Sequence, residues 1–148
     1  MYRTAVLILL GLALALPGST SAQAQAPAKD ERKAVALSEP TLVFVLTEMR
    51  NLMDALQGVA EAAGKGDWDK AAAAADKSGM KAAKATPKEV TAELPEDIRK
   101  MSRQMRLAFD AVAETAAGKR DAAAVSAKLA ETMLLCNTCH QGYRFTQK

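Results

Sequence analysis

Residues 38–64 read SEPTLVFVLTEMRNLMDALQGVAEAAG, and this stretch decides the fold class. Its apolar residues recur at three- and four-residue intervals, which is the spacing of one face of an α-helix. They are Leu42, Val45, Leu46, Met49, Leu52, Met53, Leu56, Val59 and Ala63. Ser38 and Pro40 favour the start of a helix and Gly64 favours its end, so the stretch predicts one long helix with an apolar stripe.

Three further segments carry a helical period, and no segment alternates in the manner of a β-strand. The second predicted helix is rich in alanine, begins after Asp67 and ends near Gly79. The third covers residues 95–118, and its expected buried residues are Ile98, Met101, Met105, Ala108, Phe109, Val112 and Ala116. The fourth begins after Asp121, and its expected buried residues are Ala122, Val125, Leu129, Met133, Cys136, Cys139 and Tyr143.

The four predicted helices are joined mostly by brief turns. The longest connection, residues 80–94, is polar and has room for one short helical turn, because residues 86–89 have the form of a capping box. This pattern predicts an all-α fold, an antiparallel four-helix bundle over residues 38–148. Residues 25–37 are predicted to be a flexible lead-in.

Both cysteines and the single histidine of the chain occur together, in the sequence Cys136-Asn137-Thr138-Cys139-His140. This spacing is typical of a c-type haem attachment site. Each thiol can form a thioether with one haem vinyl group, and the imidazole can bind the iron. On a helix the three side chains share one face. The motif therefore predicts one covalent haem c, inside the bundle near one end and against the C-terminal helix.

Other interpretations of the two cysteines have less support in the sequence. A zinc site needs further ligands at suitable spacing, and the chain has no other Cys or His. A thioredoxin-like dithiol normally follows a strand in a βαβ unit, and no strand is predicted. A disulfide between Cys136 and Cys139 would close a very small loop and constrain little. Covalent haem is the favoured interpretation, with a redox-active dithiol as the alternative.

The first residues have the features of an export signal. Arg3 supplies a positive charge, residues 5–16 form an apolar run, and Ala22-Gln23-Ala24 fits a cleavage site. The apolar run is too short to span a bilayer, so a cleaved signal peptide over residues 1–24 is favoured over a retained anchor. Because haem is attached outside the bacterial cytoplasm, this predicts a periplasmic protein.

The charge balance excludes some classes of partner. The formal net charge is +3, and it falls to +2 without residues 1–24, in which Arg3 is the only charged residue. So small an excess favours neither nucleic acid nor an acidic membrane surface as a partner. No constellation of acid, base or nucleophile beyond the motif is present, so an enzyme is not predicted.

The C-terminal motif continues as Gln141-Gly142-Tyr143-Arg144, and an exported helical chain ending in this way resembles the cytochrome c′ family, including its low-spin relatives. The resemblance covers roughly residues 38–146, but only the motif region is specific. Members of this family are four-helix bundles. Homodimers are common among such bundles, so the resemblance makes a homodimer one expected assembly.

The resemblance implies roles for individual residues. Cys136 and Cys139 would hold the haem, and His140 would be the proximal iron ligand. Arg144, one turn beyond, would lie near the proximal face or a propionate. The first helix faces the distal side in the family, and Met49 best matches the position of the distal residue there, with Met53 one turn away.

The sixth iron ligand divides two functions. Methionine ligation, with Met49 as first candidate and Met53 as second, predicts a low-spin electron carrier that serves periplasmic redox partner proteins. A vacant position predicts a five-coordinate protein of cytochrome c′ type that binds nitric oxide or carbon monoxide. Met101 and Met105 repeat the same spacing on the third helix, and methionine on an apolar face is often only core filler. A redox-sensing or assembly subunit is a third, weaker alternative.

Overall fold

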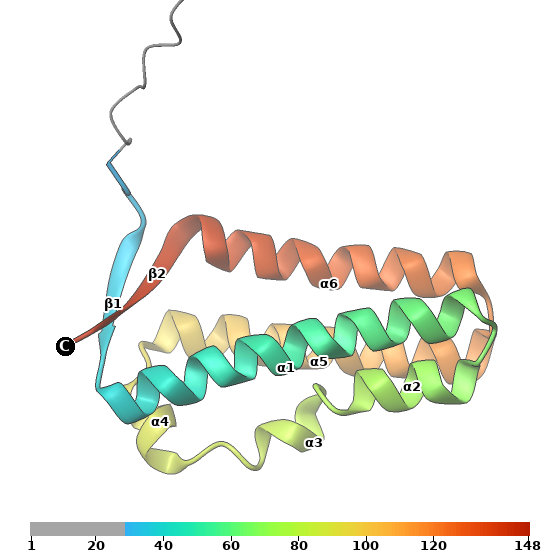
Figure 1. The fold of residues 1–148 in the computed structure, drawn as a ribbon, viewed down its shortest axis with the longest axis horizontal. Helices are drawn as coiled ribbons and strands as arrows, with labels where there is room; N and C mark the ends of the chain where they lie inside the picture. Colours follow the sequence, from blue (N-terminus) through green and yellow to red (C-terminus); the bar gives the residue numbers. More distant parts are fainter. Residues whose placement is uncertain (1–28) are drawn as a thin grey trace, which may run out of the picture. The chain divides into compact units, whose positions relative to one another are not determined.

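The computed structural model describes residues 29–148, which are mostly α-helical. The predicted signal peptide and residues 25–28 lie outside the described residues. In chain order the elements are β1 (Lys33–Leu37), α1 (Glu39–Gly64), α2 (Trp68–Asp76), α3 (Met80–Ala83), α4 (Lys88–Glu93), α5 (Glu96–Lys119), α6 (Ala122–Gly142) and β2 (Tyr143–Gln147) (Figure 1). The prediction of a helical fold class is confirmed for the described residues.

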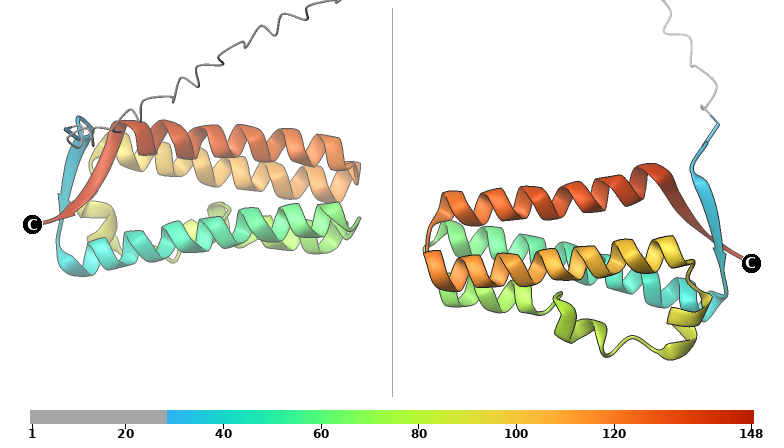
Figure 2. Two further views of the ribbon diagram at one scale, coloured as in Figure 1. Left: turned by 45° about the horizontal axis from the view of Figure 1, so that its top comes forward. Right: turned by 180° about the vertical axis from the view of Figure 1, so that it is seen from behind.

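Four of the helices, α1, α2, α5 and α6, lie alongside one another (Figures 1 and 2). α5 packs closely against both α2 and α6, and α1 packs against α2, whereas α1 and α6 contact each other much less. The helices enclose a main core, whose fully buried members include Val59, Ala71, Ala75, Phe109, Val112, Ala116 and Val125. A smaller strand-end cluster consists of Val35, Leu37, Val45 and Ile98.

Aspartate caps begin two of the helices, as predicted. The Asp67 carboxylate accepts a hydrogen bond from the Lys70 backbone N–H at 3.2 Å, at the start of α2. The Asp121 carboxylate accepts one from the Ala123 N–H at 2.9 Å, at the start of α6. Each carboxylate satisfies a backbone donor that the first turn of a helix leaves without a partner.

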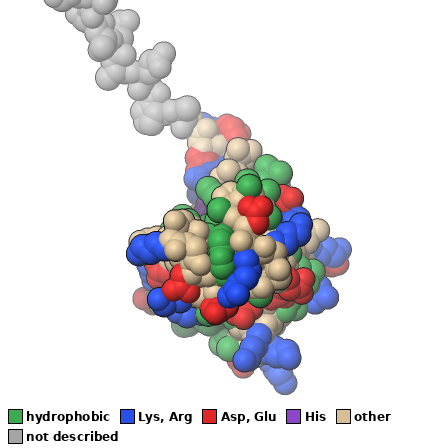
Figure 3. Space-filling view, turned by 90° about the vertical axis from the view of Figure 1, so that its right-hand side faces the viewer, with side chains coloured by type: hydrophobic (Ala, Val, Ile, Leu, Met, Phe, Trp, Pro, Cys, Tyr) green, Lys and Arg blue, Asp and Glu red, His purple; other side chains and the backbone are tan. Residues whose placement is uncertain are grey.

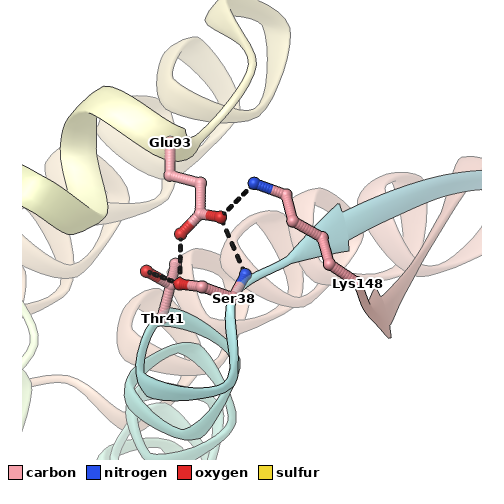
Figure 4. A network of polar contacts seen from close by, with 4 residues as sticks. All are labelled: Ser38, Thr41, Glu93 and Lys148. Carbon is pink, nitrogen blue, oxygen red and sulfur yellow. Dashed lines mark hydrogen bonds and ion pairs between the residues drawn. The ribbon is translucent and has the colours of Figure 1, made fainter.

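Ser38 also precedes its helix as predicted, but its side chain does not cap α1. Instead its backbone N–H and its hydroxyl donate to the two oxygens of Glu93, both at 2.7 Å (Figure 4). Lys148 Nζ donates to the same carboxylate at 2.6 Å. These contacts tie α1, α4 and the end of β2 together. Hydrogen bonds from Lys148, Thr41 and Ser38 hold the pKa of the Glu93 carboxyl well below its usual range.

This network predicts a loss of stability in acid. Glu93 has a usual pKa of 4.5, which is lowered in the folded protein. Below pH 4.5 the Glu93 carboxylate is protonated in the unfolded chain but remains ionised in the folded protein. The free energy of unfolding therefore falls as the pH decreases. Glu93→Gln should weaken this dependence when urea unfolding is measured between pH 7 and pH 3. Glu89→Gln, which changes an exposed carboxylate of the same helix, is the control. Equal pH dependence in the parent and the Glu93 variant would contradict the assignment.

The two strands contradict the predictions for both ends of the domain. Residues 33–37 are not part of a flexible lead-in, because they form β1 and pair in parallel with β2, Lys33 opposite Tyr143 and Leu37 opposite Gln147. The alternation of buried and exposed residues in β1 is typical of a strand, since Val35 and Leu37 are buried while the other residues of the strand are exposed. At the other end α6 stops at Gly142, so the residues that follow it are extended rather than helical.

Two details of the predicted helices are also wrong. In α6, Met133 is 50% exposed and Thr132 is fully buried in its place, because the helix presents a different face to the core than the apolar pattern suggests. The connection at residues 80–94 contains two short helices, α3 and α4, instead of one turn. No capping box forms there, since the residue that precedes α4 is Pro87, which has no side-chain donor or acceptor.

A buried ion pair joins α1 to α5, and the apolar pattern gave no sign of it. The Arg106 side chain is only 7% exposed and contacts Glu48, which is 25% exposed. The guanidinium also donates to the Ser78 carbonyl at 3.1 Å. Nearby, a Cβ at Gly79 would lie 2.0 Å from the Asp110 carboxylate, so any other residue there would force the Asp110 side chain to move.

Neither positive nor negative charge dominates the surface at the end formed by the α1–α2 and α5–α6 connections. Figure 3 shows acidic and basic side chains interspersed on this face. Such mixing agrees with the small net charge of the sequence. Among residues 29–148, no helix combines the length and the apolar character that crossing a membrane requires.

Candidate functional site

A cavity of about 210 Å³ lies between α1, α5 and α6, and β2 closes part of it. Its lining is almost entirely apolar, and the polar groups in it are Ser102 and His140. The cavity contains every residue that the haem motif and the methionine pattern singled out for ligation or attachment. These are Met49, Met53, Met101, Met105, Cys136, Cys139 and His140.

The three residues of the motif come from consecutive turns near the end of α6. Cys136 and Cys139 are half-buried free thiols, and His140 is exposed where it borders the cavity. The His140 carbonyl accepts a hydrogen bond from Arg32 Nη1 at 3.2 Å, which joins the end of α6 to the segment before β1. The predicted grouping of these three side chains on one side of α6 is confirmed.

The environment of the thiols differs from that of a reactive dithiol. Burial raises the pKa of Cys136 and, with help from the nearby Cys136 and Asp97, that of Cys139. Cysteines of disulfide oxidoreductases have lowered pKa values, because the thiolate is the attacking species. Both thiols here are therefore protonated at neutral pH, which does not favour the dithiol alternative.

The four methionines differ in depth and in neighbours. Met49 packs against the main core and the strand-end cluster, and Met101 packs against the strand-end cluster, where Cys139 also lies. Met105 packs against the main core. Met53 is 64% exposed, so the prediction that it belongs to a buried stripe is wrong. Met49 and Met101 are thus the two methionines that share a cluster with a cysteine of the motif.

Tyr143 and Arg144 belong to β2 and not to a further turn of α6. The Tyr143 hydroxyl donates to Asp97 at 2.6 Å, and Lys33 contacts both residues, with its ammonium 3.2 Å from the Asp97 carboxylate and 5.5 Å from the Tyr143 ring centroid. The hydrogen bond to Asp97 raises the pKa of Tyr143 and lowers that of Asp97. These contacts fix the junction of α6 and β2 against the first turn of α5.

That Arg144 lies near the proximal face of the haem or a propionate stays a prediction. Arg144 does not lie one helical turn beyond the motif, because the chain is extended there. It pairs with Ala34 across the two strands, and it is not among the described residues that line the cavity. Phe145 lines the cavity instead, and the sequence analysis missed it. The alternation of Tyr143 and Phe145 after the helix-ending Gly142 is the signal that could have identified both the strand and this aromatic wall.

Chemically, the cavity combines three kinds of donor among mostly apolar side chains. Two thiols can form thioethers, an imidazole can bind a metal through nitrogen, and thioether sulfur from α1 or α5 is a soft ligand. This donor set and the apolar lining fit a covalently attached haem.

No protein-family model matches the sequence, and neither the curated proteins nor the solved structures gave a significant match. The chemistry of the cavity is therefore inferred from its own residues.

Proposed function

We propose that this protein is a periplasmic c-type cytochrome that carries one covalent haem and transfers electrons. In this proposal α1, α2, α5 and α6 form an antiparallel four-helix bundle around the cofactor. One observation carries the proposal: the Cys136–His140 motif borders an apolar cavity that also contains four methionines. A structural core alone would not require that both cysteines, the single histidine and the soft sulfur ligands share one space.

Each lining residue has a role in this function. Cys136 and Cys139 would attach the cofactor to α6, and His140 would bind the iron. Met49 is the proposed second ligand, because it lies on α1 and shares the strand-end cluster with Cys139. When bound, a haem supplies a one-electron redox couple. Methionine as a ligand favours a high reduction potential, and the apolar lining keeps water away from the iron.

The cavity is small for a haem, so the proposal requires the helices around it to move apart. Its volume of about 210 Å³ is below the roughly 300–1,000 Å³ of ordinary ligand pockets. α1 and α6 contact each other much less than α1 and α2, α2 and α5, or α5 and α6 do, so this is the interface of the four long helices that we expect to open at low cost. The proposal therefore implies that α1 and α6 lie further apart in the haem-bound protein.

Covalent attachment tests the proposal directly. Expressed with a cytochrome c maturation system, the protein should gain the mass of one haem, and the haem should survive acid-acetone extraction. Cys136→Ala and Cys139→Ala should each remove one thioether, and the double variant should release all its haem on extraction. Complete extraction of haem from the unmodified protein would refute covalent binding.

A further inference from the structure

A second cavity lies on the opposite side of α5 from α6, where α3 and α4 cover α5. It has a volume of about 180 Å³. Three arginines of α5 line it, Arg99, Arg103 and Arg106, which are spaced by four and three residues and so share one face of the helix. No carboxylate is among its lining residues.

Hydroxyl groups complement the guanidinium groups in this cavity. Thr86 from the α3–α4 connection, Thr91 from α4 and Ser102 from α5 also line it. The Thr91 hydroxyl donates to the Pro87 carbonyl at 3.3 Å, so Thr86 and Ser102 supply the hydroxyl donors that remain for a ligand. Arginine and hydroxyl donors together form the kind of surface that binds an oxyanion, because guanidinium N–H groups match pairs of oxygen atoms.

The positive charge of the cavity is only partly compensated within the protein. Glu48 contacts the buried Arg106, but Arg99 and Arg103 form no ion pair with any carboxylate of residues 29–148. Three other acidic side chains of α4 and α5 are engaged elsewhere. Asp110 accepts from the Met80 N–H at 3.1 Å, Glu96 pairs with Lys100 at 2.7 Å, and Glu93 binds Ser38 and Lys148.

We propose that the cavity lined by Arg99, Arg103 and Arg106 binds a small inorganic oxyanion of the phosphate type. Arg106 is 6% exposed and held rigidly by two partners, so it forms the fixed floor of the site. Arg99 and Arg103 are exposed and contribute further guanidinium donors to the lining. The site shares Ser102 with the cavity proposed to hold the haem, but it uses none of the attachment or ligand residues.

Calorimetric titration with inorganic phosphate at constant ionic strength tests the site, with chloride as the balancing anion. The full mature protein should bind one phosphate per chain. Arg99→Gln and Arg103→Gln should each weaken binding by about tenfold, the loss expected for one charge-assisted hydrogen bond. Both arginine side chains are exposed, so the variants should keep the circular dichroism spectrum of the parent.

Lys119→Gln is the matched control, because it removes one exposed positive charge from the other end of the same helix. It should leave phosphate affinity unchanged. No saturable binding by the parent protein, or an equal loss of affinity in Lys119→Gln and the arginine variants, would overturn the proposal. The result does not depend on haem attachment, so the two proposals can fail separately.

Discussion

Met49→Leu is expected to convert the reduced protein from sharp low-spin α and β bands to a broad high-spin band. Leucine preserves most of the volume and apolar character of methionine, so the fold should lose less than about 1.5 kcal/mol. It removes the sulfur that the proposed function assigns to the iron, so the reduction potential should fall and carbon monoxide should bind readily. The absorption spectrum and a potentiometric titration of the purified protein measure both effects.

Two other methionines serve as controls for this result. Met53→Leu alters a side chain that is 64% exposed and should leave the spectrum unchanged. Met101→Leu tests the other methionine that shares the strand-end cluster with Cys139. A spectral change in the Met101 or Met53 variant instead of the Met49 variant would move the ligand assignment. A high-spin spectrum in the unmodified protein would replace electron transfer with the binding of nitric oxide or carbon monoxide.

Glu48→Gln is expected to lower the free energy of unfolding by about 3 kcal/mol. The substitution keeps the shape of the side chain but removes the charge that compensates Arg106, whose side chain is 7% exposed. The guanidinium would then be buried with neutral acceptors only, such as the Ser78 carbonyl and the amide oxygen of the substituted side chain. A urea titration should show a lower midpoint with an unchanged slope, because the folded state remains equally compact.

An exposed ion pair on the same helix provides the comparison. Glu61→Gln breaks the contact with Lys65, where both side chains are more than half exposed, and should leave the free energy of unfolding nearly unchanged. Removing both charges of the buried pair, with Glu48→Gln and Arg106→Met together, should cost less than the sum of the two single losses. Similar losses for Glu48→Gln and Glu61→Gln would show that the buried pair contributes no more than a surface pair.

The long helices could be predicted from the sequence because several independent signals agree in them. The apolar period, the aspartate caps at Asp67 and Asp121 and the stop at Gly64 all act within a few residues of the chain. Part of the lining of the cavity between α1, α5 and α6 could be predicted for the same reason. Cys136 and Cys139 lie on adjacent turns of one helix. Their position beside His140 on the same side of α6 therefore depends on local helix geometry alone.

The features that were missed depend on contacts between distant residues. β1 and β2 are five residues each. The sequence of neither strand indicates that it pairs with the other, because the pairing depends on where α1 begins and where α6 ends. From the sequence alone, Arg106 is expected to be a solvated surface charge. Its burial depends on the contact with Glu48 of α1, which is far away along the chain. The prediction that α6 continues past Gly142 to Arg144 was wrong, because Arg144 pairs with Ala34 in the two-stranded sheet.

The pairing of β1 with β2 gives one end of the molecule its own opening equilibrium. Lys33 and Tyr143 are far apart along the chain, so the pairing closes a long loop at a cost in conformational entropy. A pair of five-residue strands is also marginally stable without further strands. Backbone amides of residues 33–37 should therefore exchange with solvent through local opening, ahead of the amides of α1. Such a breathing motion would uncover the Phe145 wall and the Cys139 end of the cavity while the helices stay folded.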